Sequence, residues 1–188
     1  MPSWNIVGLP DTGIKESKDR IKTAIKNCGI ELLSRKYIIN LSPADVRKEG
    51  TCLDLPIAIA ILKSIGQIRP FNLDKVIFIG ELSLDGKINR VNGVLPICLE
   101  ALKYGINKVI LPIENVMEAS VVDGIEIIGV KSLGEAINYL NNKIQIIPSK
   151  SNLSGIFSNS NKSDLDFSEV KGQESIKRAL EVAAAGRT

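Results

Sequence analysis

The chain has 188 residues, of which 44% are hydrophobic, and its 24 lysines and arginines nearly balance its 21 aspartates and glutamates. This length is enough for one folded domain with a hydrophobic core, or for one domain and a tail. A formal net charge of +3 does not by itself identify a nucleic-acid-binding or membrane-surface protein. No stretch approaches the roughly 20 apolar residues of a membrane span, and the start lacks the regions of a signal peptide, so a cytoplasmic protein is expected.

The first 30 residues predict a strand followed by an amphipathic helix. Residues 5–7 read as the end of a strand, and Asp11 or Thr12 can cap a helix that ends near Gly29. The apolar residues of this helix share one face at helical spacing: Ile14, Ile21, Ala24, Ile25 and Cys28. One side of the helix is therefore expected to face the core.

The next segment predicts a strand, a loop and a second helix. Residues 37–41 have the composition of a strand, and a loop with the sequence KEGTC follows. Asp54 is expected to cap a helix that keeps Pro56 in its first turn and runs to Gly66. Because this helix is nearly all apolar, it is expected at the centre of the fold.

The sequence then alternates strands and helices to about residue 140. Residues 76–79 read as a buried strand, and Asp85-Gly86 and Asn92-Gly93 mark two turns. The later elements are a helix that stops at Gly105, a strand at 108–113, a short helix at 117–122, a strand at 125–130 and a helix opened by the Ser132 to Glu135 capping box. This order predicts a mixed α/β arrangement of the α+β class.

The last 44 residues differ in composition from the rest. Residues 145–164 are rich in Ser, Asn and Lys and read as a flexible linker, which leaves residues 1–144 as the folded domain. Residues 165–188 form a turn and a helix from about 173 to 185, too few for a domain of their own. We therefore expect a segment of a longer protein, with its first strand and its last domain incomplete.

The residues available for catalysis are restricted. The chain has no histidine, which is the commonest general base and transition-metal ligand. Its three cysteines, Cys28, Cys52 and Cys98, lack any C-x-x-C spacing, so we expect reduced thiols without a zinc site or a disulfide. Asp45, Glu49, Asp54, Glu81 and Asp85 match no metal-ligand motif and are expected in caps, turns, ion pairs and solvated faces.

Four segments carry a family resemblance: NIVGLPDTGIKESKDRIKTAIKN, NLSPADVRKEGTCLDLPIAIAIL, GELSLDGKINRVNGVLPI and DFSEVKGQESIKRALEVAAAG. Together they resemble the amino-terminal half of the magnesium-chelatase-like AAA+ ATPases of the YifB or ComM family. The resemblance implies a ChlI domain that is similar in fold to the Lon proteolytic domain and to ribosomal protein S5 domain 2. It covers almost the whole chain.

The resemblance also gives Cys52 a possible role. Lon-type proteases use a Ser–Lys dyad, and the KEGTC loop is similar to their serine loop, which places Cys52 at the nucleophile position. The helix after Asn92-Gly93 is similar to their lysine helix, but Leu95 stands where the lysine would be. A cysteine needs a nearby base or cation to ionise near neutral pH. Lys48 and Lys87 are the lysines that could approach Cys52, and nothing in the sequence places either of them there.

The tail resembles the first segment of an AAA+ module. In such modules the residues that correspond to Val170, Gly172 and Gln173 lie beside the adenine of ATP. No G-x-x-x-x-G-K-[ST] motif occurs in the sequence, so the chain itself is not expected to hydrolyse ATP. The resemblance implies ATP and magnesium as cofactors of the parent protein, a P-loop shortly after the AAAG at 183–186, a hexameric ring, and DNA as a partner in transformation and recombination.

Three hypotheses for the chain remain at this point. The first is a non-catalytic module of a ComM-like DNA motor, with a helicase or branch-migration role for the parent. The second is a Lon-like peptidase that uses Cys52. The third is a protein-binding module. The basic residues of the first helix, Lys15, Lys18, Arg20, Lys22 and Lys26, are the best local candidates for DNA contact, although Glu16 and Asp19 in the same helix also fit an ordinary solvated face.

Overall fold

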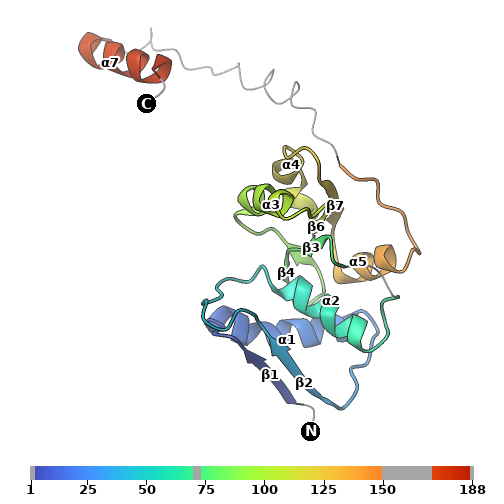
Figure 1. Ribbon diagram of the computed structural model, residues 1–188. Helices are drawn as coiled ribbons and strands as arrows, with labels where there is room; N and C mark the ends of the chain where they lie inside the picture. Colours follow the sequence, from blue (N-terminus) through green and yellow to red (C-terminus); the bar gives the residue numbers. More distant parts are fainter. Residues whose placement is uncertain (1–2, 70–72, 150–170, 187–188) are drawn as a thin grey trace. The chain divides into compact units, whose positions relative to one another are not determined.

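The computed structural model describes residues 3–69, 73–149 and 171–186 (Figure 1). The chain falls into two compact units, Met1–Ser151 and Asn152–Thr188, and each is described by itself. The described part of the second unit is one helix, α7 (Glu174–Ala185). Val170, one of the three residues expected beside adenine, lies outside the described residues.

The first unit contains the predicted mixture of strands and helices. Its strands are β1 (Ser3–Val7), β2 (Lys36–Asn40), β3 (Val76–Phe78), β4 (Glu81–Leu82), β5 (Ile88–Asn89), β6 (Lys108–Pro112) and β7 (Glu126–Val130). Its helices are α1 (Thr12–Asn27), α2 (Asp54–Ser64), α3 (Val94–Lys103), the 3-10 helix η1 (Ile113–Asn115), α4 (Val116–Ala119) and α5 (Leu133–Leu140). The predicted order of elements is confirmed, and the structure adds η1. No described helix is both long and apolar enough to span a membrane.

A parallel sheet with the strand order β3-β6-β7 separates two hydrophobic clusters. Val109 of β6 is in register with Ile77 of β3 and Ile127 of β7. Alternate residues of these strands face opposite sides. Ile110 therefore packs with α1, α2 and α5 in one cluster, and Val109 packs with α3 and α4 in the other. Each face of the sheet thus contributes side chains to one of the two hydrophobic clusters.

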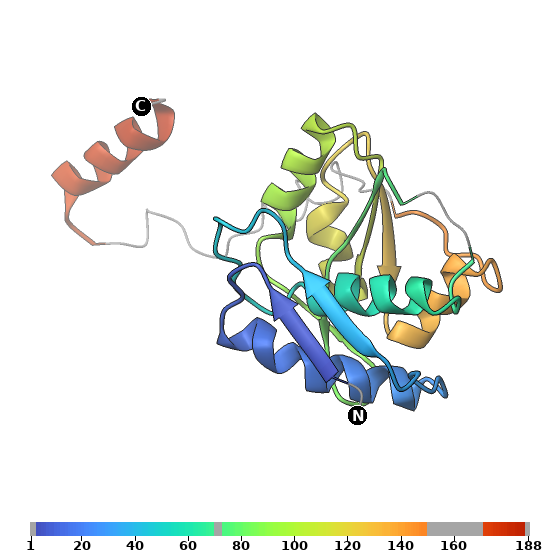
Figure 2. The same cartoon turned by 60° about the horizontal axis from the view of Figure 1, so that its bottom comes forward.

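A second, two-stranded parallel sheet covers the far side of α1 and α2 (Figure 2). Trp4 of β1 and Tyr37 of β2 are paired in register and face the same cluster as the two helices. Their ring centroids lie 5.2 Å apart at an interplanar angle of 42°, a tilted aromatic pair. The first unit is therefore layered as strand pair, helices α1 and α2, three-stranded sheet, and helices α3 and α4.

Helix starts follow the local sequence at two of the predicted positions. Asp11 accepts a hydrogen bond from the Ile14 N–H at 2.8 Å, so it caps α1, as one of the two predicted alternatives. Ser132 accepts from the Glu135 N–H at 3.2 Å, and the Glu135 carboxylate in turn accepts from the Lys131 N–H at 2.5 Å. Both caps satisfy backbone donors that lack a partner within their helix.

The predicted linker begins beside the sheet. The Ser149 N–H donates to the Ile127 carbonyl at 2.9 Å, and Ile146 packs against the cluster of α1, α2 and α5. Residues 145–149 therefore pack as part of the first unit, and residues 150–164 lie outside the described residues. The predicted linker over residues 145–164 stays a prediction.

Candidate functional site

The loop that carries Cys52 is held by backbone hydrogen bonds to its neighbours. The Cys52 carbonyl accepts from the Gly80 N–H at 3.0 Å, and the Gly80 carbonyl accepts from the Leu55 N–H at 3.0 Å. A Cβ at Gly80 would lie 2.6 Å from a side-chain carbon of Ile88, so the close approach requires glycine. On the other side, the Gly50 N–H donates to Asp11 at 3.0 Å. The loop is fixed in place.

Cys52 itself is half-buried against the cluster of α3 and α4. Burial raises the pKa of its thiol, and the carboxylate of Asp54 raises it further, against a lowering by a backbone hydrogen bond. Since only the thiolate is an efficient nucleophile, this environment keeps Cys52 in its unreactive form near neutral pH.

The lysines considered as partners of Cys52 are engaged elsewhere. The Lys48 ammonium donates to the carbonyl of Pro43 and, at 2.7 Å, to that of Val46. Lys87 forms an ion pair with Asp85 at 2.9 Å. No cation contributes to the pKa of Cys52 among the described residues. The structure therefore brings neither lysine to the thiol.

Leu95, which the resemblance matches to the lysine position, packs on the same cluster as Cys52. It lies in the first turn of α3, where its N–H donates to Glu118 of α4 at 3.1 Å. The preceding turn is fixed by Asn115, whose side chain is fully buried and bonds both the N–H and the carbonyl of Val91, at 3.0 and 2.8 Å. The carboxylate of Glu118 thus occupies the start of α3.

The prediction that Asp54 caps α2 is wrong. The cap position is Leu53, and no side chain bonds the start of the helix. Asp54 is 1% exposed and accepts two hydrogen bonds from Arg20, at 2.8 and 3.2 Å, and one from the Leu82 N–H at 3.1 Å. Because a buried carboxylate requires a charged partner, the guanidinium outcompetes the local backbone N–H groups for it.

The pKa values of this pair follow from the same contacts. Burial raises the pKa of the Asp54 carboxyl, against the hydrogen bonds from Arg20 and Leu82, which lower it. The bond to Asp54 raises the pKa of Arg20, so the guanidinium keeps its charge. Arg20 also donates to the Gly13 carbonyl at 3.2 Å, which fixes it along α1.

The other acidic residues of this region do not converge on one point. Glu81 accepts from the Thr51 hydroxyl and, at 3.3 Å, from Asn89, whereas Glu49 pairs with Arg47 at 3.1 Å. In the part of the chain that the structure describes, no group of three or more His, Cys, Asp or Glu side chains is placed to hold a metal ion.

The sequence named Arg20 only as a basic candidate for DNA contact, not as the partner of Asp54, and it did not identify Glu118 as a site residue. Arg20 lies beside the buried face of α1 that contains Ser17 and Ile21. A charged residue at such a position could have indicated a buried ion pair. A lone Asp54 at the start of an apolar helix was the matching signal for a buried ion pair. Nothing in the sequence around Glu118 indicates that it accepts a hydrogen bond from Leu95 of α3, because Glu118 and Leu95 meet only where α4 packs on α3.

Comparison with known proteins places the chain among related sequences. Residues 1–115 match the family described as subunit ChlI of Mg-chelatase. Competence protein ComM of Haemophilus influenzae is 34% identical over 187 residues, which cover 99% of this chain and 36% of ComM. YifB of Escherichia coli is 38% identical over 186 residues with the same coverage. DNA repair protein RadA of Bacillus subtilis is 32% identical over 127 residues, 67% of this chain and 27% of RadA. The chain thus spans about a third of the length of ComM and YifB.

Replacing Asp54 with Asn should lower the free energy of unfolding by about 3 kcal/mol, because it leaves Arg20 without its carboxylate inside the fold. Urea unfolding followed by circular dichroism measures the change. The double variant Arg20→Met, Asp54→Asn should recover part of the loss. As a matched control, Glu100→Gln removes an exposed pair with Lys103 and should change stability by less than about 0.5 kcal/mol. An equal effect of Asp54→Asn and Glu100→Gln contradicts this account of the buried pair.

The three thiols should react slowly with iodoacetamide in the folded chain at pH 8. Burial raises the pKa of all three and raises that of Cys98, which is 0% exposed, to about 11. Peptide mass spectrometry of the labelled chain should therefore give Cys98 the lowest rate and Cys52 a lower rate than in urea. Faster labelling of Cys52 in the folded chain than in urea would mean that its thiol is activated.

Proposed function

The chain belongs to the family described as subunit ChlI of Mg-chelatase, and we propose that it is the non-catalytic amino-terminal module of a ComM-like AAA+ ATPase. In this proposal residues 1–144 have the Lon-proteolytic-domain-like fold of ribosomal protein S5 domain 2, and residues 145–164 link them to the first segment of the ATPase at 165–188. The loop of Cys52 then serves as a structural connection between α2 and the sheet.

One observation supports the non-catalytic part of the proposal: among the residues that the structure describes, no cation activates the thiol of Cys52. Its pKa is raised by burial, and the two lysines that could have served it bond other groups. A Ser–Lys or Cys–Lys dyad requires the base within hydrogen-bond reach of the nucleophile. At the nearby start of α3 the side chain is that of Leu95, and the Leu95 N–H donates to the carboxylate of Glu118.

The parent protein would be an ATP-driven motor on DNA. The names of two relatives, competence protein ComM and DNA repair protein RadA, support a role with DNA for those proteins, and we extend it to this one. The parent would form a homo-oligomeric, hexameric ring in the cytoplasm and act in transformation and recombination as a helicase or in branch migration. This module would help assemble the ring or guide the DNA.

ATP and magnesium would bind in the parent, with the phosphates and the metal held beyond the residues present here. Hydrolysis of ATP supplies the free energy that moves the DNA. Gly172 and Gln173, which precede α7, both have positive φ, at 74° and 63°, and so form a tight turn of exposed backbone. Such a turn can approach a flat ring closely. With Val170, these residues are proposed to line the adenine side of the nucleotide site.

The peptidase hypothesis makes an opposite prediction, which a cleavage assay tests. Unfolded peptides incubated with the chain should remain intact over hours at pH 7 to 8, as followed by mass spectrometry. Saturable cleavage that is lost in Cys52→Ala and retained in Cys28→Ala would refute the non-catalytic proposal. Cys28 is a suitable control because it is also half-buried and its pKa is also raised by burial.

The parent ATPase is tested by the residues encoded after Thr188. We expect a G-x-x-x-x-G-K-[ST] motif there within a short distance, and a protein that includes it should hydrolyse ATP faster when DNA is added. Replacing the lysine of that motif with Ala should abolish hydrolysis. A coding sequence that continues without this motif contradicts the proposal that the parent is an AAA+ ATPase.

A further inference from the structure

Four lysines of α1 form a continuous basic surface, which we call the lysine stripe: Lys15, Lys18, Lys22 and Lys26. Their spacings of three, four and four residues place them on one face of the helix. All four are exposed, whereas the adjoining face of α1 is buried in the core through Ile14, Ile21 and Ile25. The packing of its buried face fixes the orientation of α1, so the lysine stripe stays exposed to solvent.

The charges of the stripe are largely uncompensated. In the described residues, no ion pair or hydrogen bond involves the ammonium groups of Lys18, Lys22 or Lys26, and Lys15 is only attracted by the nearby Asp11. Elsewhere in the first unit, Lys87 and Lys108 each pair with a carboxylate. Asp19 borders the stripe and Glu16 lies further round the helix, and neither forms an ion pair with it.

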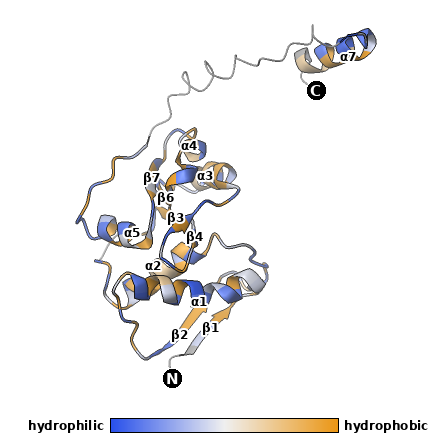
Figure 3. Ribbon diagram, turned by 180° about the vertical axis from the view of Figure 1, so that it is seen from behind, coloured by the Kyte–Doolittle hydropathy of each residue, from blue (hydrophilic) through white to orange (hydrophobic). Residues whose placement is uncertain are grey.

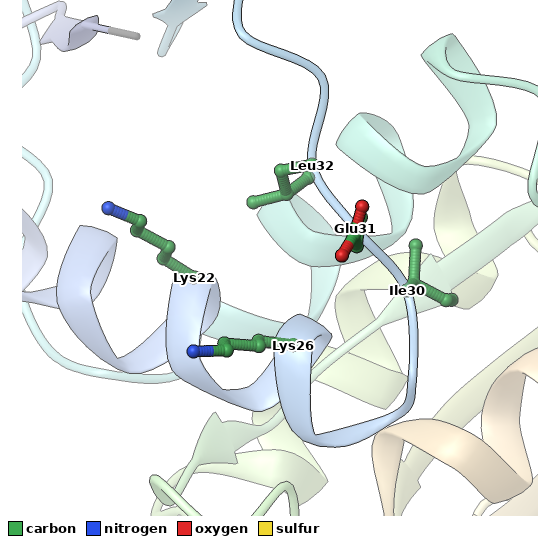
Figure 4. A pocket seen from close by; sticks show the side chains of 5 residues that line it. All are labelled: Lys22, Lys26, Ile30, Glu31 and Leu32. Atoms are coloured by element: carbon green, nitrogen blue, oxygen red, sulfur yellow. The ribbon is translucent and has the colours of Figure 1, made fainter. Parts of the chain in front are cut away.

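Shallow hollows run along the stripe. One of about 380 Å³ lies between β1 and the pair Lys15 and Lys18, and one of about 290 Å³ lies between Lys15 and Arg47. A third, of about 230 Å³, is lined by Lys22 and Lys26 on α1 and by residues 30–32. Figure 4 shows the two lysines extending from the helix toward the same side, with Glu31 on the following loop.

The shape of this surface favours a long ligand over a compact one. Each hollow is near or below the lower end of the roughly 300–1,000 Å³ typical of small-molecule sites. The lysines instead follow a line, and in the view from behind α1 carries several hydrophilic stretches along its length (Figure 3). The ligand with matching charge is a linear polyanion.

The spacing of the charges fits a nucleic-acid backbone. At about 1.5 Å per residue, the 11 steps from Lys15 to Lys26 span about 16 Å. One strand of a duplex carries a phosphate about every 3.4 Å along the axis, so this length faces roughly five phosphates. Because a strand also winds around the axis over this length, four lysines on one line can contact about four phosphates when both strands of the duplex contribute.

We propose that the lysine stripe is a binding surface for the phosphate backbone of DNA, independent of base sequence. The proposal rests on the function proposed above and assigns that function's DNA contact to α1. Lysine is a point charge that suits phosphate oxygens but does not read base edges in the bidentate manner of arginine. Arg20, the one arginine of α1, is held by Asp54 and lies outside this surface.

The test measures binding of the 188-residue chain to a fluorescent 20-base-pair duplex of mixed sequence by anisotropy, from 50 to 200 mM salt. The affinity should lie in the range of non-specific binding, and log K should fall with log salt at a slope of roughly −3 to −4, for about four phosphates contacted. The stripe variant Lys15→Gln, Lys18→Gln, Lys22→Gln, Lys26→Gln should bind at least tenfold more weakly at 50 mM salt and lose most of that slope.

A matched control variant changes four exposed lysines away from α1: Lys63→Gln, Lys75→Gln, Lys131→Gln and Lys143→Gln. Each variant removes four charges from the net charge of +3, so overall charge is equal in the two. The control should bind within about threefold of the original chain, and the thermal unfolding of both variants should match it. Equal losses in the two variants, no binding of the original chain at 50 mM salt, or binding to a poly-glutamate peptide but not to DNA would overturn the proposal.

These outcomes separate the surface from the wider function. If the stripe variant binds as the original chain does while peptides remain uncleaved, the stripe is the wrong surface and the non-catalytic module stands. If Cys52-dependent cleavage is observed, the proposed function fails whatever the DNA result is.

Discussion

The bidentate ion pair between Arg20 and Asp54 is the interaction on which the arrangement of the first unit depends. Asp54 begins α2, Arg20 lies on α1, and the same carboxylate accepts the N–H of Leu82 in β4. Three elements from separate parts of the sequence therefore meet at one buried carboxylate. Because an unpaired charge at this depth is strongly unfavourable, the pair fixes how the two helices and the strand are oriented.

The position of the Cys52 loop follows from this arrangement. Asp54 fixes the start of α2, and the hydrogen bonds of Gly80 to Cys52 and Leu55 connect the same helix start to the strand region. The loop of Cys52 is thus tied to the start of α2 and to the strand region by backbone hydrogen bonds. The lysine stripe depends on the same pair, since Arg20 holds α1 with its buried face inward and its lysines in solvent.

Local signals predicted the elements well, and tertiary contacts determined the site. Asp11 and Ser132 could be read as caps because the groups they bond lie three residues away. The partners Arg20 and Asp54 are 34 residues apart, and Leu95 and Glu118 are 23 apart, so no periodicity indicates them. The sequence predicted that Asp54 caps α2, because an aspartate at a helix start commonly serves as a cap. The carboxylate is instead buried and pairs with Arg20, and the sequence pattern does not give the degree of burial.

The fold keeps Cys52 as a neutral thiol through burial and the nearby Asp54 carboxylate. Its pKa can be measured directly from the pH dependence of its 13Cβ chemical shift in the folded chain, with selective labelling of cysteine. We expect a pKa above the value of about 8.5 for a free cysteine, because burial and Asp54 both raise it. A pKa below about 7 would mean that a cation reaches the thiol and that Cys52 is not held in its neutral form.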